Sequence, residues 1–247
     1  NPGLIEAVEK SRIETVEQVR ECFVEACKLT LRSDVPVGVS LSGGLDSSAI
    51  LAVTAHKYKD NLKAFSIGYK DRVASDERAL ARELADKFGV EFIEGEIDTK
   101  MMINDFPQLI FDMDDPIADI AAHPIREVSR LAKKNGVSVL LGGIGGDELF
   151  WGYSWTQKTV QKMIERTGDK MPDFYAQTPG FIWAERLTKK LYQKEFVASL
   201  PRESASRFLE SNLPVGKLKL ARHGLDLIRD LWLKSNCLVL SDRLSMS

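Results

Sequence analysis

The most informative segment of the sequence is Val37-Gly38-Val39-Ser40-Leu41-Ser42-Gly43-Gly44-Leu45-Asp46-Ser47-Ser48-Ala49-Ile50-Leu51. An apolar run rich in β-branched residues breaks there into small polar residues and resumes as a helix-forming run, which predicts a strand, a tight loop and a helix. Two consecutive glycines bring backbone N–H groups close to a ligand, and the helix N-terminus that follows adds a partial positive charge. The stretch therefore predicts an anion site, and phosphate is the anion that we expect there.

The same loop indicates a nucleotide and a metal ion. A nucleotide triphosphate carries roughly four negative charges against about half a charge at a helix end, so we expect Asp46 to hold Mg²⁺. Ser42, Ser47 and Ser48 add hydroxyl donors. No Lys follows the glycines and the spacing is not GxGxxG, so the loop is neither a Walker A nor a dinucleotide loop. The alternative is an ordinary turn between strand and helix, capped by Asp46 or a serine.

The rest of the hydrophobic pattern predicts an α/β fold. Helices are predicted at residues 15–31, 46–57, 75–88, 100–111 and 121–135, and strands at 62–69, 90–97 and 137–141 besides the one that starts at Val37. Strands that alternate with helices form a parallel twisted sheet with helices on both faces. Helix-like segments without strands follow Ser154, at residues 156–166, 182–193, 194–200, 202–213 and 225–241.

This pattern divides the chain into a linker (residues 1–14), an α/β core (15–155) and a helical C-terminal part (156–247). In the helical stretch that follows Ser154 we expect three tryptophans to pack as core, namely Trp155, Trp183 and Trp232. The helical period predicts a buried face in two helices of the core. These faces consist of Val16, Val19, Phe23, Cys27 and Leu31 in the first and of Leu80, Leu84 and Phe88 in the second.

A second glycine loop follows the strand at residues 137–141, in the run Gly142-Gly143-Ile144-Gly145-Gly146-Asp147-Glu148. Four glycines in five positions are costly in conformational entropy for an ordinary turn, so we expect a ligand to touch this backbone. Because ligands of open α/β sheets bind outside the carboxyl ends of the strands, this loop should face the first one. A purely structural turn is the alternative.

The sequence allows two roles for each of two groups of carboxylates. Asp112, Asp114 and Asp115 lie within four positions, where they are either solvated or bind Mg²⁺ or an ammonium group. Asp76 and Glu77 precede a helix, where they either cap it or serve a substrate or a metal.

Composition excludes several classes of protein. A net charge of −2 over 247 residues gives no electrostatic reason to expect nucleic acid or an anionic membrane as a partner. No apolar run reaches the ~18 residues of a membrane span, and the polar start is not a signal peptide, so we expect a cytoplasmic protein. Cys22, Cys27 and Cys237 form no CxxC, which argues against a disulfide framework or a cysteine-based zinc site. We expect structural or surface roles for the scattered histidines, His56, His123 and His223.

Several motifs in order resemble the synthetase domain of the asparagine synthetase family, over the chain from about Glu14 onward. They are Arg32-Ser33-Asp34-Val35-Pro36-Val37-Gly38, Ser42-Gly43-Gly44-Leu45-Asp46-Ser47-Ser48, Phe65-Ser66-Ile67-Gly68, Asp115-Pro116, Gly145-Gly146-Asp147-Glu148-Leu149-Phe150 with Gly152-Tyr153, and Asp242-Arg243-Leu244-Ser245-Met246. The second of them is similar to the pyrophosphate (PP) loop of ATP pyrophosphatases. The resemblance implies their fold, the adenine nucleotide alpha hydrolase-like sheet.

The resemblance also implies a reaction and its residues. ATP activates a carboxylate, aspartate by default, to an acyl-adenylate with release of pyrophosphate, and ammonia or another amine then attacks. Asp46 and Asp147 become catalytic residues, with Asp46 the Mg²⁺ ligand. The ATP and pyrophosphate site comprises Leu41, Ser42, Gly43, Gly44, Asp46, Ser47, Ser48, Ile67 and Gly68, with Leu41 and Ile67 flanking adenine. The acyl-adenylate site comprises Gly142, Gly143, Gly145, Gly146, Asp147 and Asp115.

Three departures from the family pattern bear on function. The chain opens Asn1-Pro2-Gly3 instead of with the Cys nucleophile of a glutaminase domain, so we expect that domain to be supplied, if at all, by the full-length protein. It stops at Ser247, where the family continues through helices that carry a pyrophosphate-contacting Lys, so we expect a truncated helical part. Ile144 occupies a position that is usually acidic in asparagine synthetases, and a hydrocarbon cannot act as a general base.

Two alternatives to asparagine synthesis follow. A related ligase would adenylate a different acid or use a different amine, as relatives that make β-lactams or amidate sugar acids do, and Ile144 favours this alternative. A nucleotide-binding domain without catalysis is the other, and the intact Asp46 and glycine loops argue against it. A tRNA-modifying relative is disfavoured by the mild acidity and the missing CxxC.

Overall fold

The computed structural model describes residues 11–58, 61–70, 76–114, 119–165, 187, 190–199, 222 and 224–246. These residues form two compact units, one that reaches to Gly143 and includes the chain from Ser241 on, and one that spans Ile144–Leu240. The first unit contains α1 (Arg12–Thr30), β1 (Val37–Ser40), α2 (Leu45–Tyr58), β2 (Lys63–Tyr69), α3 (Arg78–Phe88), β3 (Glu91–Ile97), α4 (Thr99–Met113), α5 (Ala122–Lys134) and β4 (Val139–Leu141). Every helix and strand predicted up to residue 141 is present in the first unit, within a few residues of its expected bounds.

The four strands form one parallel sheet in the order β3-β2-β1-β4, which confirms the predicted α/β fold. The register pairs Val39 with Ala64 on one side of β1 and with Leu141 on the other. After β1 the chain adds β2 and β3 on one side of β1, and the connection from β3 to β4 crosses to the other side. The carboxyl ends of β1 and β4 are therefore the topological switch point, where open α/β sheets bind their ligands.

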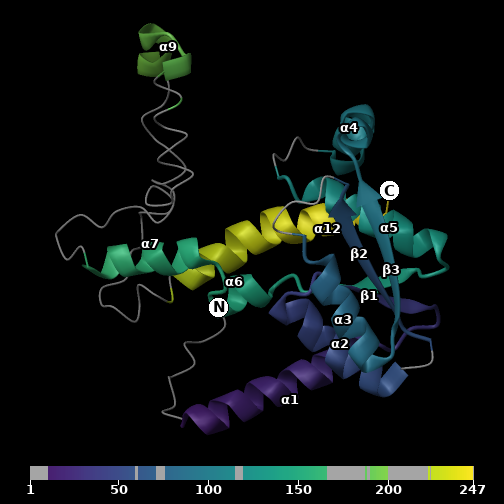
Figure 1. Cartoon of the computed structure of the whole chain (residues 1–247). Coiled ribbons are helices and arrows are strands. Elements are labelled where there is room, and N and C mark those ends of the chain that lie inside the picture. The colour runs from purple at the N-terminus through teal and green to yellow at the C-terminus, as the bar shows by residue number, and fades with distance from the viewer. Residues whose placement is uncertain are drawn as a thin grey trace. The chain divides into compact units, whose positions relative to one another are not determined.

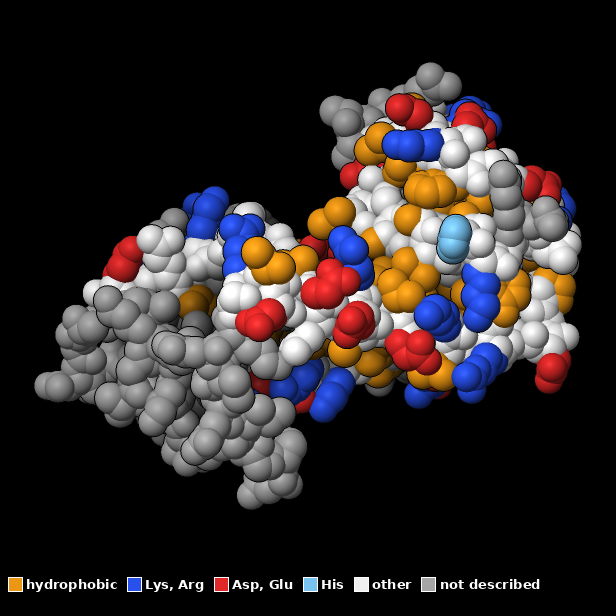
Figure 2. Space-filling view, turned by 90° about the horizontal axis from the view of Figure 1, so that it is seen from below, with side chains coloured by type: hydrophobic (Ala, Val, Ile, Leu, Met, Phe, Trp, Pro, Cys, Tyr) orange, Lys and Arg blue, Asp and Glu red, His pale blue; other side chains and the backbone are white. Residues whose placement is uncertain are grey.

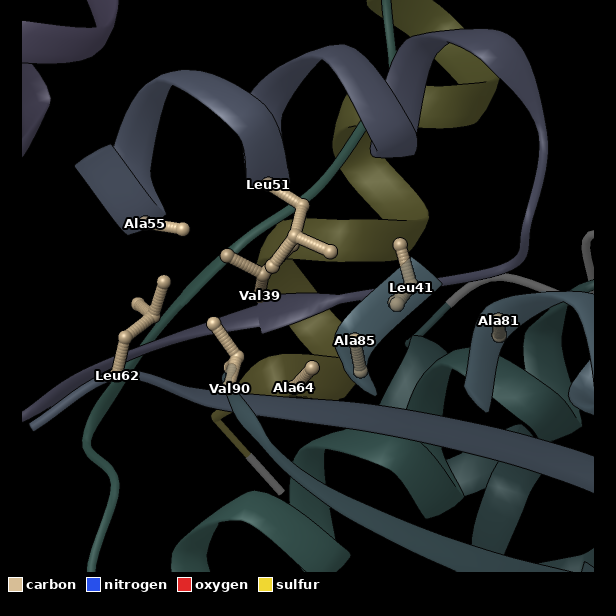
Figure 3. Packing of buried hydrophobic residues seen from close by; sticks show 9 residues of the cluster. All are labelled: Val39, Leu41, Leu51, Ala55, Leu62, Ala64, Ala81, Ala85 and Val90. Atoms are coloured by element: carbon tan, nitrogen blue, oxygen red, sulfur yellow. The ribbon is translucent and has the colours of Figure 1, made fainter. Parts of the chain in front are cut away.

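Helices cover both faces of the sheet (Figure 1). On one face, α2 and α3 pack over β1 and β2 through nine buried apolar side chains (Figure 3), which are Val39, Leu41, Leu51, Ala55, Leu62, Ala64, Ala81, Ala85 and Val90. On the other face, Val128 and Ala132 of α5 pack against Phe65 and Val137. Side chains of successive strand residues point to opposite faces, so Ala64 serves the first core and Phe65 the second.

The predicted buried face of α3 is correct only in part. Leu80 is 48% exposed, whereas Ala81 and Ala85 are fully buried together with most of Arg78. Small alanines let the α3 backbone approach the sheet closely, and the hydrophobic period placed the larger leucine there instead. Leu84 and Phe88 do contact this core, but only as half-buried residues at its margin.

The predicted buried face of α1 is correct only in its second half. Cys27 and Leu31 are buried, but Val16 and Val19 are 54% and 43% exposed. The buried residues come near the end of the helix, where it leads into β1. Its start is held by a capping box, in which the Ser11 side chain accepts from the Glu14 N–H and the Glu14 carboxylate accepts from the Ser11 N–H at 2.9 Å.

The second unit is helical in its described residues. It contains α6 (Gly146–Phe150), α7 (Ser154–Glu165), α9 (Lys194–Ser199) and η2 (Ile228–Cys237), a helix of π-type hydrogen bonding, and α12 (Leu238–Ser245) leads back to the first unit. Trp155 and Trp232 meet edge to face at 6.4 Å, but both are only half-buried, so the prediction that they pack as core is correct only in part. The predictions for Trp183 and for residues 202–213 lie outside the described residues.

Candidate functional site

Serine side chains hold the first loop in shape. The Ser47 hydroxyl accepts a hydrogen bond from the Ser42 N–H and donates one to the Gly44 carbonyl, both at 3.2 Å. The Ser48 hydroxyl donates to the same carbonyl at 2.6 Å, and the Ser42 hydroxyl accepts from the Gly44 N–H. The hydroxyls predicted as ligand donors thus make bonds within the loop, and Ser47 is 5% exposed. They fix the backbone conformation at the start of α2.

Glycines let this loop fit between two neighbours. Gly43 has φ +84°, and a Cβ there would lie 3.3 Å from backbone atoms of Glu77 and Ala81 at the start of α3. Gly143 lies on the other side, where a Cβ would approach the Asp46 Cβ to 2.9 Å and the Ser47 nitrogen to 3.1 Å. The prediction that the second glycine loop faces the first therefore holds for Gly143. The neighbouring Gly142 is exposed, and a Cβ added there would have no neighbouring atom within 4 Å.

A cavity of about 230 Å³ opens at the carboxyl ends of β1 and β2. Four residues predicted to bind ATP line it, namely Leu41, Ser42, Ile67 and Gly68. Pro124, Ile125 and Val128 of α5 add an apolar wall. An apolar slot next to a glycine loop is suited to an adenine ring whose phosphates extend toward the loop.

Arg78 forms a buried ion-pair centre beside this cavity that the sequence analysis missed. Its guanidinium is 7% exposed and lies 2.7 Å from Asp76 and 3.0 Å from Glu96. These carboxylates raise the pKa of Arg78, the hydrogen bond that it donates to Asp76 being the largest cause. A Cβ at Gly68 would overlap the guanidinium, so Gly68 makes room for Arg78. Asp76 therefore pairs with Arg78. The sequence could have indicated this pair, because Asp76 stands two residues before an arginine at the start of a helix.

The second glycine loop continues into the second unit, where Glu148 organises it. The carboxylate is 4% exposed and accepts from the Gly145 N–H at 2.9 Å and from the Tyr153 hydroxyl at 2.5 Å. The Cys237 thiol of η2 donates to it at 3.5 Å. Burial, followed by the bond to Glu148, raises the pKa of Tyr153, which keeps its proton available for this bond. Glu148 is thus a structural residue inside the loop.

Asp147 and Ile144 have different surroundings in that unit. Asp147 is half-buried in the first turn of α6, and a Cβ at Gly152 would overlap its carboxylate, so the family-like Gly152 leaves space for this side chain. Ile144 is 44% exposed. Gly145 has φ +105°, which favours glycine, and Gly146 begins α6.

The carboxylates at residues 112–115 form ion pairs with arginines. Asp112 lies 3.0 Å from Arg126, and Asp114 pairs with Arg243. The Asp112 side chain is 9% exposed and that of Asp114 is 64% exposed, so the solvated alternative is wrong for Asp112 but holds for Asp114. Asp115 lies outside the described residues, so its assignment to the acyl-adenylate stays a prediction.

Asp46 can hold a metal together with phosphate oxygens. It is half-buried in the first turn of α2, next to Gly143. In the described ranges it belongs to no group of three or more candidate metal-ligating side chains. Such a sparse site suits Mg²⁺, which keeps several waters and binds through one or two carboxylates plus substrate phosphates.

The coloured face in Figure 2 mixes basic and acidic side chains without a large patch of one sign. None of the described helices combines the length and the apolar character that crossing a membrane requires.

Comparison with known proteins identifies relatives. The family model described as asparagine synthase matches residues 18–247. Asparagine synthetase [glutamine-hydrolyzing] 1 of Bacillus subtilis is 42% identical over 139 residues, which are 56% of this chain and 22% of that protein. Amidase chry2 of Gibberella zeae is 29% identical over 157 residues, which are 58% of this chain and 23% of that protein. The chain thus spans less than a quarter of the length of these two relatives.

Among solved structures, the glutamine-dependent NAD+ synthetase of Acinetobacter baumannii in complex with ADP aligns with a TM-score of 0.43 and 20% identity. The alignment covers 81% of this chain and 44% of that one.

Proposed function

The chain belongs to the asparagine synthase family, and from this premise we propose that it is the synthetase part of an ATP-dependent amide-forming ligase. The default reaction converts aspartate to asparagine with release of AMP and pyrophosphate. The observation that carries the proposal is the serine-braced loop at the switch point, with Gly143 against Asp46 and the cavity beside it. The Bacillus subtilis relative is named an asparagine synthetase, which supports this substrate.

In the first step, a carboxylate oxygen of the substrate attacks the α-phosphorus of ATP. The bond between the α-phosphorus and the bridging oxygen breaks, pyrophosphate leaves with its electron pair, and an acyl-adenylate forms. We assign pyrophosphate to the Gly43–Gly44 backbone and the N-terminus of α2, where N–H groups lack helical partners. Leu41 and Ile67 line the cavity and would flank adenine.

Asp46 fits a magnesium ion because it offers a carboxylate at the same helix end. Mg²⁺ bound there would neutralise charge on the phosphates as pyrophosphate leaves. Asp46 would thereby orient the phosphates relative to the Gly43–Gly44 backbone.

In the second step, an amine nitrogen attacks the acyl carbon, the bond to AMP breaks and the nitrogen loses a proton. By position in the family pattern, we assign Gly142, Gly143, Gly145, Gly146, Asp147 and Asp115 to the acyl-adenylate. The nitrogen would be ammonia from a glutaminase part of the full-length protein, since the Bacillus subtilis relative is named glutamine-hydrolysing.

Exchange of labelled pyrophosphate into ATP tests the adenylation site. In the full-length protein with aspartate, we expect Asp46→Asn to lower exchange by at least ~10²-fold, because a bound metal contributes several kcal/mol of charge stabilisation. The control is Asp86→Asn, which makes the same change at an exposed position of α3. Near-normal exchange by the Asp46 variant would show that this residue only caps the helix.

A second candidate function, a ligase for another acid or amine, is favoured by Ile144. The amine must lose a proton, and general-base help typically contributes ~10²–10⁴-fold. The half-exposed isoleucine supplies none. The name of the Gibberella relative, an amidase, is compatible with chemistry other than asparagine synthesis.

The Ile144→Glu substitution separates the two candidates. With aspartate, ATP and ammonium, we expect it to raise the ratio of amide formed to adenylate hydrolysed by at least ~10-fold if asparagine is the product. The Leu149→Glu change at an exposed position of α6 is the control for an added carboxylate close to the loop. Efficient asparagine formation by the unsubstituted protein, with no gain in the variant, would refute the argument from Ile144. A panel of amino and sugar acids in the exchange assay identifies the acid in either case.

A further inference from the structure

Three side chains of types that can bind a metal ion meet between α4 and α5, two helices that pack together (Figure 1). Asp105 comes from α4, and His123 and Glu127 come from α5. One ligand atom of each lies within 4.8 Å of the other two. His123 and Glu127 are four residues apart, so they share one face of their helix, which points toward Asp105.

The imidazole of His123 is the observation that calls for a ligand. The side chain is 3% exposed, and both ring nitrogens are buried without a hydrogen-bond partner. Buried polar atoms in folded proteins are nearly always satisfied, and an unsatisfied one calls for an explanation such as a bound ion or water. The unpartnered imidazole lies in the same cluster as the carboxylates of Asp105 and Glu127, whose oxygens are the complementary ligands.

Two arginines approach the cluster but hold it loosely. Arg126 and Arg130 lie 4.0 and 3.9 Å from the Asp105 carboxylate, and Arg130 donates a long hydrogen bond of 3.4 Å to Glu127. These separations exceed those of strong, hydrogen-bonded ion pairs, which are ~2.7–2.9 Å. Arg126 is closer to Asp112, at 3.0 Å. Three carboxylates thus face two guanidinium groups, so the net charge is negative and does not oppose a cation.

The ligand types select the kind of metal. Mg²⁺ and Ca²⁺ prefer oxygen ligands, whereas an imidazole with carboxylates suits zinc and similar ions. Zinc binds nitrogen and oxygen at ~2.0–2.2 Å, which places tetrahedral ligand atoms roughly 3.3–3.6 Å apart. The three ligand atoms lie within 4.8 Å of one another, so side-chain movement has to bring them closer around the ion. Water can complete the coordination.

We propose that Asp105, His123 and Glu127 bind one divalent transition-metal ion of the Zn²⁺ type that joins α4 to α5. The site is separate from the proposed Mg²⁺ site at Asp46. The role that we assign to the ion is structural. It would bind to α5, the helix that also supplies Pro124, Ile125 and Val128 to the wall of the cavity. An ion that ties α5 to α4 would hold that wall in place. Without an ion, the same cluster is an ion-pair network around Arg126 and Arg130.

Cobalt substitution and zinc titration of the full-length chain test the proposal. After treatment with a chelator, we expect one equivalent of Co²⁺ to give d–d absorption without a thiolate charge-transfer band, because no cysteine belongs to the site. Calorimetric titration should give one Zn²⁺ site. The affinity for Zn²⁺ should fall by at least ~10-fold in each of the variants Asp105→Asn, His123→Gln and Glu127→Gln. Loss of a residue that only supports a metal ligand already lowers metal affinity by about 10-fold or more.

Matched controls and a stability readout complete the test. His56→Gln and Glu83→Gln make the same changes at exposed positions of α2 and α3 and should leave zinc affinity unchanged. Zinc should raise the melting temperature of the unsubstituted chain and not that of Glu127→Gln, whose near-isosteric change on a half-buried side chain preserves packing. If the unsubstituted chain binds no zinc at micromolar concentration, or binds it equally after His123→Gln, or shows a thiolate band, the proposal is wrong. If His123→Gln does not fold, the cobalt spectrum of the unsubstituted chain and the zinc affinity of Glu127→Gln test the proposal instead.

Discussion

At the scale of single residues, two adjacent glycines have different surroundings. A Cβ at Gly143 would contact the Asp46 side chain and the Ser47 backbone, whereas one at Gly142 would meet nothing within 4 Å. Neither has a positive φ, so Ala is conformationally acceptable at both. The pair therefore separates steric contact with the first loop from other effects of adding a methyl group.

We expect Gly143→Ala to lower ATP–pyrophosphate exchange by ~10–10²-fold relative to Gly142→Ala. The added Cβ would displace Asp46 and the start of α2, and a displacement of about 1 Å in a positioning group can cost ~10²-fold in rate. Exchange measured at saturating ATP, with circular dichroism to verify folding, provides the comparison. Equal rates for the two variants would mean that the contact between the loops does not position the phosphates.

At the scale of the elements, α3 shows that small residues decide which face is buried. Ala81 and Ala85 are fully buried against the sheet, and Leu80 is 48% exposed although it fits the hydrophobic period. The same helix brings Arg78 over Gly68 and places its N-terminal turn against Gly43. Close packing of α3 therefore supports both the cavity and the first loop.

We expect Ala85→Leu to destabilise the protein by ~1–3 kcal/mol, since extra methylene groups in a packed core force shifts of side chains and backbone. Leu80→Ala, which removes a larger apolar side chain from the exposed face, should change stability by less than about 0.5 kcal/mol. Urea unfolding followed by fluorescence measures both. The reverse order of effects would indicate that α3 buries its leucine face.

At the scale of the whole molecule, contacts between distant segments complete the second unit. Cys237 of η2 and Tyr153 both donate to Glu148, although Cys237 lies 89 residues away in the sequence. The same carboxylate accepts from Gly145 in the glycine loop. A buried charge therefore links the loop, the segment after α6 and the last helices of that unit.

We expect Tyr153→Phe to cost ~1.5–3 kcal/mol, because a hydrogen bond to a charged group is lost and Glu148 stays buried. Tyr192→Phe at a more exposed ring provides the control, with a change below about 0.5 kcal/mol. Thermal unfolding of the full-length protein is the measurement. If the two variants are equally stable, the bond from Tyr153 contributes little to holding the loop.

The sequence alone determined the alternation of strands and helices, the parallel α/β fold and the position of both glycine loops. These features depend on local patterns, since periodicity and paired glycines act over a few residues. The family motifs led to the same conclusion, and the family assignment is confirmed by the match over residues 18–247. The chemical roles of Asp46 and Asp147 stay predictions, and the Asp46→Asn variant tests the first of them.

The tertiary structure alone decided which faces are buried and which side chains meet. Arg78 pairs with Glu96 on a different element, Glu148 bonds to Cys237 across the second unit, and Asp105 lies beside His123 on a neighbouring helix. Such pairs join residues whose separation in sequence has no fixed period. The exposed Leu80 beside the buried Ala81 has the same cause, because only the distance between a helix and the sheet decides whether a small or a large side chain fits.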